Sequence, residues 1–250
     1  MTAFLTEIKK CRGRKLWFVY LCAFAVILLW LGGALSRNPL METEAETGYY
    51  YLLLNYTLMN LIFFPIVLAT AASRVCDIEN KGNTYKQLFT MQSRLSLFHC
   101  KLLLNSIYIF LFCLGEVVSL YTMGKIFHVT QEVPWKLIGW FLVSTFGVSL
   151  ILYIMQQVLS LLMANQLMPL FIGLMGTFTG VFSAFFPNTI LTSIVPWGYY
   201  AVSSPVVMEY SRGATTFSIV PLPFGQLLGF LIFGLAFYII GVNKYLKKEV

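Results

Sequence analysis

The chain has 250 residues, of which 58% are hydrophobic and only 11% are charged, and its mean hydropathy is +0.78. An ordinary soluble domain carries roughly 25% charged residues, which cover its surface, so this composition excludes a soluble globular protein. The net charge of +7 does not indicate a nucleic-acid partner, because no basic patch with interleaved aromatic residues accompanies it.

Six stretches of about twenty mostly apolar residues follow one another along the chain, and almost every charge lies between them. About twenty helical residues cross a hydrocarbon core of about 30 Å, and no backbone amide can stay unpaired in lipid. We therefore predict an all-α integral membrane protein with a single transmembrane domain over residues 1–250. The first run is longer than the apolar part of a secretory signal peptide, so we expect a span there rather than a cleaved leader. The six spans are expected at about Leu16–Leu35, Tyr50–Ala72, Leu102–Tyr121, Leu137–Leu159, Leu167–Phe186 and Phe224–Val242.

The basic residues between the spans predict the orientation, because loops on the cytosolic side of a membrane are enriched in Lys and Arg. Of the 17 Lys and Arg residues, four lie on one side, namely Arg37, Lys125, Lys136 and Arg212. The other 13 lie before the first span, between the second and third spans, and after the last span. Both termini are therefore expected in the cytosol, as an even number of spans also requires.

The connection before the last span, residues 187–223, contains five prolines. The apolar runs Thr189–Val195 and Trp197–Val202 lie between these prolines and are too short to cross a membrane. Because Pro interrupts helices, we expect a broken, re-entrant pair of helices that dips into the outer leaflet.

Catalytic chemistry has few candidate residues. The only histidines, His99 and His128, fall on opposite sides of the predicted membrane and belong to no H-E-x-x-H pattern. The chain also lacks a G-x-x-x-x-G-K-[ST] loop, and its five cysteines follow no C-x-x-C spacing. We expect a protein that is not an enzyme, binds no cofactor or metal itself, and keeps its cysteines as free, buried thiols.

Five polar residues lie inside predicted spans, where polar groups are costly and usually face other helices. They are Asn55, Asn60, Glu116, Gln156 and Gln157. Glu116 is expected to face the bundle interior, to be protonated, or to lie nearer the outer interface. A role of Glu116 in proton or ion coupling is an open alternative to a hydrogen-bonded packing role. These residues could line a substrate path, but helix packing is the favoured interpretation.

Glycine pairs with i, i+4 spacing occur in the last two spans. Gly176 and Gly180 form the first pair, and Gly225 and Gly229 form the second. Such pairs permit close helix approach. Packing within the subunit is favoured over a subunit interface.

The cytosolic connection after the second span contains the most informative polar residues. Asp77, Glu79 and Asn80 can cap the start of a helix, where carboxylates favour the free amides and the positive end of the dipole. Further along, Tyr85, Leu88 and Phe89 at helical spacing would then form an apolar stripe that suits a groove on a partner protein. The alternative is an interfacial helix that lies on the membrane surface.

The order of residues in this connection is Glu79, Gly82, Thr84, Lys86, Leu88, Ser93, Arg94 and Lys101. This pattern resembles the first cytosolic loop of ABC-2 type permeases, which supplies the coupling helix that contacts the partner ATPase. The sequence departs from the family pattern at two places. Asn83 stands between the Gly and the Thr, and Met91-Gln92 replaces the usual proline before Ser93-Arg94. The length and the E-x-x-x-x-T-x-K-x-L form are most similar to lantibiotic-immunity permeases.

The resemblance implies a permease subunit in a bacterial cell membrane, surrounded by lipid and paired with a second permease subunit, which is expected to differ from the first. ATP and Mg²⁺ would be bound by separate cytosolic ABC ATPase subunits, and the substrate would be an antimicrobial peptide. ATPase-coupling residues implied by the resemblance are Asp77, Glu79, Asn80, Thr84, Tyr85, Lys86, Leu88, Phe89 and Arg94.

Other functions stay open at this point. The chain could be a membrane scaffold or sensor without a transport path, or an ABC-2 exporter of another drug, lipid or ion. A membrane enzyme is the weakest alternative. Outer acidic residues would attract a cationic peptide, although a solvated loop explains them more simply. These acids are Glu42, Glu44, Glu46, Glu132 and Glu209.

Overall fold

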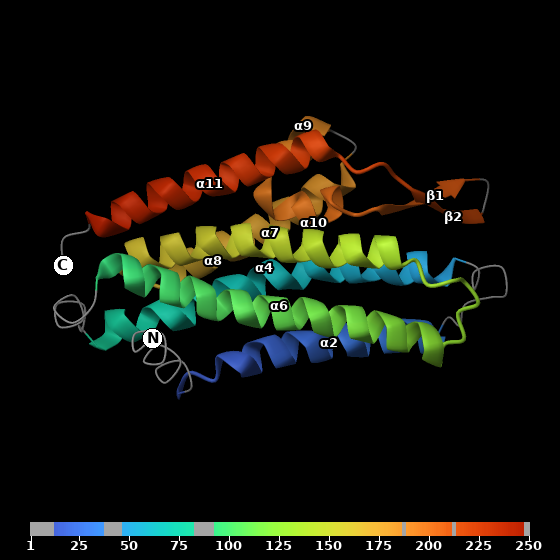
Figure 1. The fold of residues 1–250 in the computed structure, drawn as a ribbon, viewed down its shortest axis with the longest axis horizontal. Coiled ribbons are helices and arrows are strands. Elements are labelled where there is room, and N and C mark those ends of the chain that lie inside the picture. Colours follow the sequence, from blue (N-terminus) through green and yellow to red (C-terminus); the bar gives the residue numbers. More distant parts are fainter. Residues whose placement is uncertain (1–12, 38–46, 83–92, 187–188, 212–213, 248–250) are drawn as a thin grey trace.

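The computed structural model describes residues 13–37, 47–82, 93–186, 189–211 and 214–247. Six long helices lie side by side along the long axis of the molecule (Figure 1), and each is long and apolar enough to cross a membrane. The prediction of a helical protein with six spans is confirmed. The helices are α2 Leu16–Arg37, α4 Gly48–Gly82, α6 Arg94–Ile126, α7 Trp135–Leu162, α8 Leu167–Phe185 and α11 Phe224–Leu246.

Helices α4 and α6 are longer than a membrane is thick. They contain 35 and 33 residues, so each extends over about 50 Å at about 1.5 Å per residue. A hydrocarbon core of about 30 Å leaves several turns of each helix outside it. The charged residues of α4 all lie in its last turns, from Arg74 onwards, so these turns project from the membrane.

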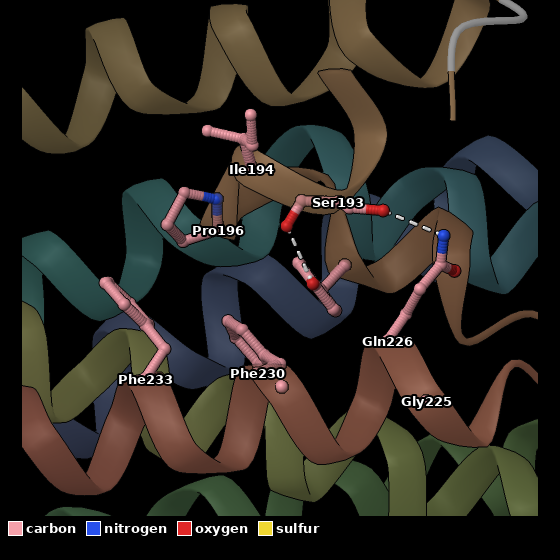
Figure 2. A pocket seen from close by; sticks show the side chains of 9 residues that line it. Ser193, Ile194, Pro196, Gly225, Gln226, Phe230 and Phe233 are labelled. Atoms are coloured by element: carbon pink, nitrogen blue, oxygen red, sulfur yellow. Dashed lines mark hydrogen bonds between the residues drawn. The ribbon is translucent and has the colours of Figure 1, made fainter. Parts of the chain in front are cut away.

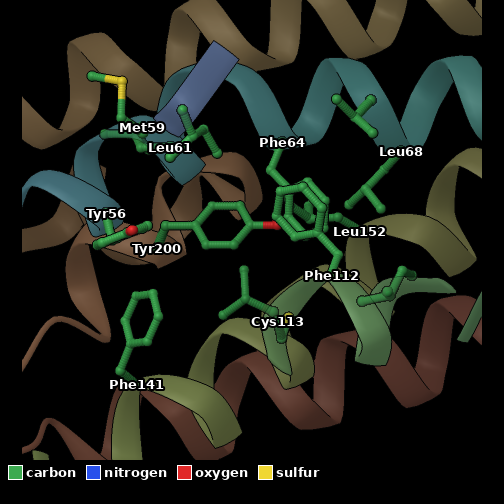
Figure 3. Packing of buried hydrophobic residues seen from close by; sticks show 14 of the residues in the cluster. Tyr56, Met59, Leu61, Phe64, Leu68, Phe112, Cys113, Phe141, Leu152 and Tyr200 are labelled. Carbon is green, nitrogen blue, oxygen red and sulfur yellow. The ribbon is translucent and has the colours of Figure 1, made fainter. Parts of the chain in front are cut away.

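Helix α4 is the centre of the bundle and packs against α2, α6, α7 and α8. Its buried side chains include Leu68 and also Tyr56 and Phe64, which meet Phe141 of α7 and Phe112 of α6 respectively (Figure 3). Phe64 stacks on Phe112 of α6 with 4.3 Å between ring centroids. Because lipid is as apolar as these side chains, the stabilisation comes from close packing rather than from escape from water. Displacement of α4 therefore has to displace its neighbours.

The connection between α8 and α11 folds back onto the bundle. It contains α9 Thr189–Ile194, the 3₁₀ helix η1 Pro196–Gly198 and α10 Tyr199–Val202. The side chain of Tyr200 reaches the bundle centre (Figure 3), where its hydroxyl is hydrogen-bonded to Ser149 Oγ of α7 at 2.8 Å. The expected pair of short helices is therefore present, with η1 inserted between them.

A β-hairpin follows these short helices, and the sequence interpretation missed it. Strands β1 Val206–Ser211 and β2 Ala214–Ile219 pair antiparallel, with Val206 opposite Ile219. The hairpin lies at the end of the bundle where α6 and α7 connect (Figure 1). The predicted pair of short helices covers residues 189–202, and no prediction was made for the part of the connection that forms the hairpin.

The two glycine pairs have different surroundings. A Cβ atom on Gly176 or Gly180 would collide with Trp197 of η1. The absence of side chains at these two positions therefore lets η1 pack directly against α8. A Cβ atom on Gly225 or Gly229 would meet nothing within 4 Å. The prediction of packing within the subunit is thus confirmed for the first pair alone.

Candidate functional site

The ends of α2, α4, α6 and α11 meet at one end of the bundle. Arg14, just before α2, forms an ion pair with Asp77 of α4 at 3.5 Å. Arg74 of α4 donates to the carbonyl oxygen of Arg14 at 3.2 Å. Arg94, the first residue of α6, donates to the carbonyl oxygen of Leu246 at 2.7 Å. These contacts tie α2 to α4 and α6 to α11, beside the two ends of the segment 83–92.

Asp77, Glu79 and Asn80 do not start a new helix, which corrects the capping interpretation. They belong to the last turns of α4, which continues without a break to Gly82. A carboxylate near the C-terminal end of a helix is disfavoured by the helix dipole. Arg14, just before α2, supplies the compensating charge for Asp77. The two residues are 63 positions apart, so local sequence could not predict this contact.

The other predicted coupling residues are described only in part. The backbones of Glu79 and Asn80 are helical, and Arg94 begins α6 with Ser93 as its N-cap. Five predicted residues lie outside the described part of the chain, namely Thr84, Tyr85, Lys86, Leu88 and Phe89. The predicted coupling helix therefore stays a prediction.

Lys101 is a feature that the charge count did not distinguish from the exposed basic residues. Its side chain is fully buried between α6 and α4. The ammonium group donates to the carbonyl oxygen of Val75 at 3.1 Å. A buried charge that is hydrogen-bonded in this way fixes the separation of α4 and α6 just before both helices leave the membrane.

The polar residues predicted inside the spans do not converge on one cavity. Asn60 donates to Glu116 at 3.1 Å, and both side chains are buried, which confirms that Glu116 faces the bundle interior. Asn55 donates to the carbonyl oxygen of Tyr51 in its own helix at 2.9 Å. Gln157 donates to the carbonyl oxygen of Phe98 in α6 at 2.9 Å. The contacts of Asn60 with Glu116 and of Gln157 with Phe98 join different helices, as the packing interpretation expects, whereas that of Asn55 stays within α4.

Gln156 belongs to a buried polar stripe on α7 that the sequence interpretation did not identify as a unit. Its amide is buried against Gly173 of α8 and Ala69 of α4. The stripe follows helical spacing along α7 and faces the other helices. Its other buried members are Thr145, Ser149 and Ser160. The i, i+4 spacing of these residues was the available signal.

A groove lies between α11 and the short helices α9, η1 and α10 (Figure 2), with a cavity of about 450 Å³. Gln226 of α11 donates to Ser193 Oγ at 2.8 Å at its polar end. Tyr199 and Phe230 stack in its wall with 4.0 Å between centroids. Gly225 and Gly229 leave the α11 side open. The second glycine pair, read as a packing motif, therefore forms a groove instead.

The His, Cys, Asp and Glu side chains of the described ranges are spread over several helices and their connections. No group of three His, Cys, Asp or Glu side chains there could hold a metal ion. Cys76 and Cys113 are buried, as predicted, whereas Cys22 on α2 is exposed and Cys100 on α6 is half-buried, which corrects the expectation of burial for these two residues. Among outward-facing helix positions in a membrane, exposure means contact with lipid, and a thiol tolerates that environment.

A family model for ABC-2 family transporter proteins matches residues 3–180. The match spans most of the chain, from before α2 into α8, so the chain belongs to this family. It is a membrane component of an ABC-2 transporter. Neither the comparison with curated proteins nor the comparison with solved structures gives a match.

Proposed function

We propose that this chain is the permease subunit of an ABC transporter that protects a bacterium from a lantibiotic or similar antimicrobial peptide. The observation that carries the proposal is the course of α4 and α6, which flank residues 83–92 at the end of the bundle that carries Arg14, Arg74 and Arg94. Family membership supports the transporter class. The form of the loop around Glu79 supports the peptide-immunity subtype.

In this proposal the chain performs no catalysis. A separate cytosolic ATPase pair binds ATP and Mg²⁺ and contacts residues 83–92. Movement of this segment acts on α4 and α6 together, because Lys101 and the Asn60–Glu116 pair join the two helices. Since α4 also packs against α2, α7 and α8, its displacement would change the arrangement of the whole bundle. A second, different permease subunit completes the membrane part.

The outer end supports a cationic peptide as the substrate. Glu132 before α7 and Glu209 on β1 are both exposed, and negative charges at this surface would raise the local concentration of a cationic peptide. The proposal places the chain in the plasma membrane of a bacterium, with both termini in the cytosol, which is the orientation that the distribution of Lys and Arg predicts.

Substitutions in the coupling segment test the proposal. We expect Glu79→Ala, and a double Tyr85→Ala and Leu88→Ala variant, to reduce co-purification with the ATPase encoded beside this gene at least about tenfold, because each apolar or charged anchor in a groove contributes about 1.4 kcal/mol or more. Protection of cells against a panel of bacteriocins should fall in parallel.

Glu132→Ala is the matched control, since it removes the same side chain at the opposite end of the bundle. The ATPase should co-purify with this variant at the wild-type level. If both coupling variants keep normal complex formation and normal protection, the coupling assignment is wrong. If the complex forms but no peptide of the panel is resisted, the transporter handles another substrate.

A further inference from the structure

The pair formed by Glu116 of α6 and Asn60 of α4 lies within the membrane-spanning part of both helices. Glu116 stands nine residues before Lys125, or about 14 Å along the helix axis. Both side chains are fully buried, at 0% exposure. The amide Nδ2 of Asn60 donates to Oε2 of Glu116 at 3.1 Å. A carboxyl group is therefore enclosed by protein at a depth where an ionised form is costly.

Each member of this pair has one side-chain oxygen without a hydrogen-bond partner among the described residues. These oxygens are Oε1 of Glu116 and Oδ1 of Asn60. An ionised carboxylate and an amide oxygen both accept hydrogen bonds and cannot satisfy one another. The missing component is a donor, because a buried acceptor without a donor carries its full desolvation cost.

The neighbouring side chains supply no compensating charge, and the tyrosine hydroxyls among them are already hydrogen-bonded. The titratable groups that face Glu116 are Tyr56 of α4, Cys113 of α6 and Tyr200 of α10, with Tyr20 of α2 next to Cys113 and Tyr200. The hydroxyl of Tyr56 is hydrogen-bonded to Ser119 Oγ at 2.7 Å, and that of Tyr200 to Ser149 Oγ at 2.8 Å.

Charged residues of the surrounding helices lie at the helix ends. On α7 the one charged residue is Lys136, which is exposed in the first turn. On α2 it is Arg37, the last residue of the helix. On α4 the charged residues begin at Arg74, fourteen residues after Asn60. On α6 itself Lys101 stands fifteen residues before Glu116, and on α11 the charged residue is Lys244 in the last turn. Among the described residues no cation therefore lies beside Glu116 to neutralise its ionised form.

We propose that Glu116 is a proton-binding site, in which a proton on Oε1 converts Glu116 and Asn60 into a carboxylic acid–carboxamide pair. A hydronium ion from the aqueous phase supplies the proton and is left as water, and the new O–H bond neutralises the carboxylate. The new O–H donates to Oδ1 of Asn60, while Nδ2 of Asn60 continues to donate to Oε2. One proton thus removes the buried charge and satisfies both free oxygens.

A metal cation is a poorer ligand for this pair. Calcium takes six to eight oxygen ligands and magnesium takes about six, whereas this site offers two oxygens surrounded by apolar side chains and engaged hydroxyls. A proton needs one donor position and one acceptor, which is what the pair provides.

The site has a consequence for movement. Helices α4 and α6 lead to the two ends of residues 83–92, and the protonated pair joins them at a point well inside the membrane. Because the pair is neutral, the helices can separate there without placing a carboxylate in the membrane. This inference goes beyond the proposed peptide substrate and does not depend on it.

Difference infrared spectroscopy of the full chain in lipid nanodiscs tests the proposal. At neutral pH the spectrum of wild type minus Glu116→Gln should contain the C=O stretch of a protonated carboxyl group. That band should persist when Na⁺ is replaced by choline and when divalent cations are chelated. In Asn60→Leu, which retains Glu116 but lacks the acceptor, the band should shift to higher frequency.

Stability measurements provide a second readout. The Glu116→Gln variant can form an amide–amide pair with two hydrogen bonds, so it should unfold at the wild-type temperature, whereas Glu116→Ala should unfold earlier. Carboxylate stretches assigned to Glu116 at neutral pH, in place of the protonated band, would overturn the proposal. A band that appears only after cation removal would identify a cation site instead. If Glu116→Gln does not fold, the shift in Asn60→Leu decides the question.

Discussion

Replacing Gly180 by Leu is expected to lower the free energy of unfolding by about 3 kcal/mol, at the upper end of the usual cost of overpacking. A Cβ atom at this position would lie 2.7 Å from the carbonyl carbon of Trp197 and 3.0 Å from the backbone nitrogen of Gly198. Backbone atoms cannot rotate away as a flexible side chain would. Helix α8 and η1 would have to separate, which also withdraws Tyr200 from the bundle centre.

Gly229→Leu is the matched control, because it makes the same substitution in the other glycine pair, where nothing lies within 4 Å of the new Cβ. Both variants gain similar helix propensity, about 1 kcal/mol relative to Gly, so the difference between them isolates the collision. This difference in stability is measured by thermal unfolding in detergent, with the loss of the monodisperse fraction as the readout. Equal unfolding temperatures would show that η1 does not depend on the α8 glycine.

Lys101→Glu is expected to prevent recovery of folded protein. The ammonium of Lys101 is fully buried and donates to the carbonyl oxygen of Val75. A carboxylate at this position has no donor to give to the carbonyl oxygen of Val75. An uncompensated buried charge costs about 3–5 kcal/mol or more. That loss is comparable to the total stability of many domains.

Lys136→Glu makes the same charge change at an exposed position of α7 and should leave folding intact. Lys101→Met keeps most of the side-chain volume without the charge, so its effect should be intermediate. The yield of monodisperse protein in fluorescence-detected size-exclusion chromatography compares the three variants. A normal yield for Lys101→Glu would mean that this side chain reaches water.

The connection before α11 shows where local signals were insufficient. The apolar, Pro-rich sequence correctly indicated two segments too short to span the membrane, and α9 and α10 form within these segments. Strands β1 and β2 were missed although β-branched residues and Gly213 between them were available signals. The hairpin is stabilised by cross-strand pairs such as Val206 with Ile219. The local sequence did not distinguish it from a helix, because apolar runs beside a membrane also suit helices.

The inner end of α4 shows the same difficulty with charge. Asp77, Glu79 and Asn80 are typical residues for a helix start, yet they occupy a helix end. Their position is tolerated because Arg14, 63 residues away, pairs with Asp77. Local capping preferences are worth about 1 kcal/mol, so one ion pair and continuous packing along α4 can override them.

Hydropathy along the chain was enough to establish the class of protein and the number of spans, because lipid requires long apolar helices whose backbone groups are satisfied internally. The order of residues between the spans was enough for the resemblance to ABC-2 permeases, which the family match confirms. Which polar groups meet inside the membrane became clear from the three-dimensional packing alone. Asn60 and Glu116 are 56 residues apart, and Gln157 and Phe98 are 59 residues apart. Such pairs depend on how helices rotate and pack against one another, which hydropathy does not specify.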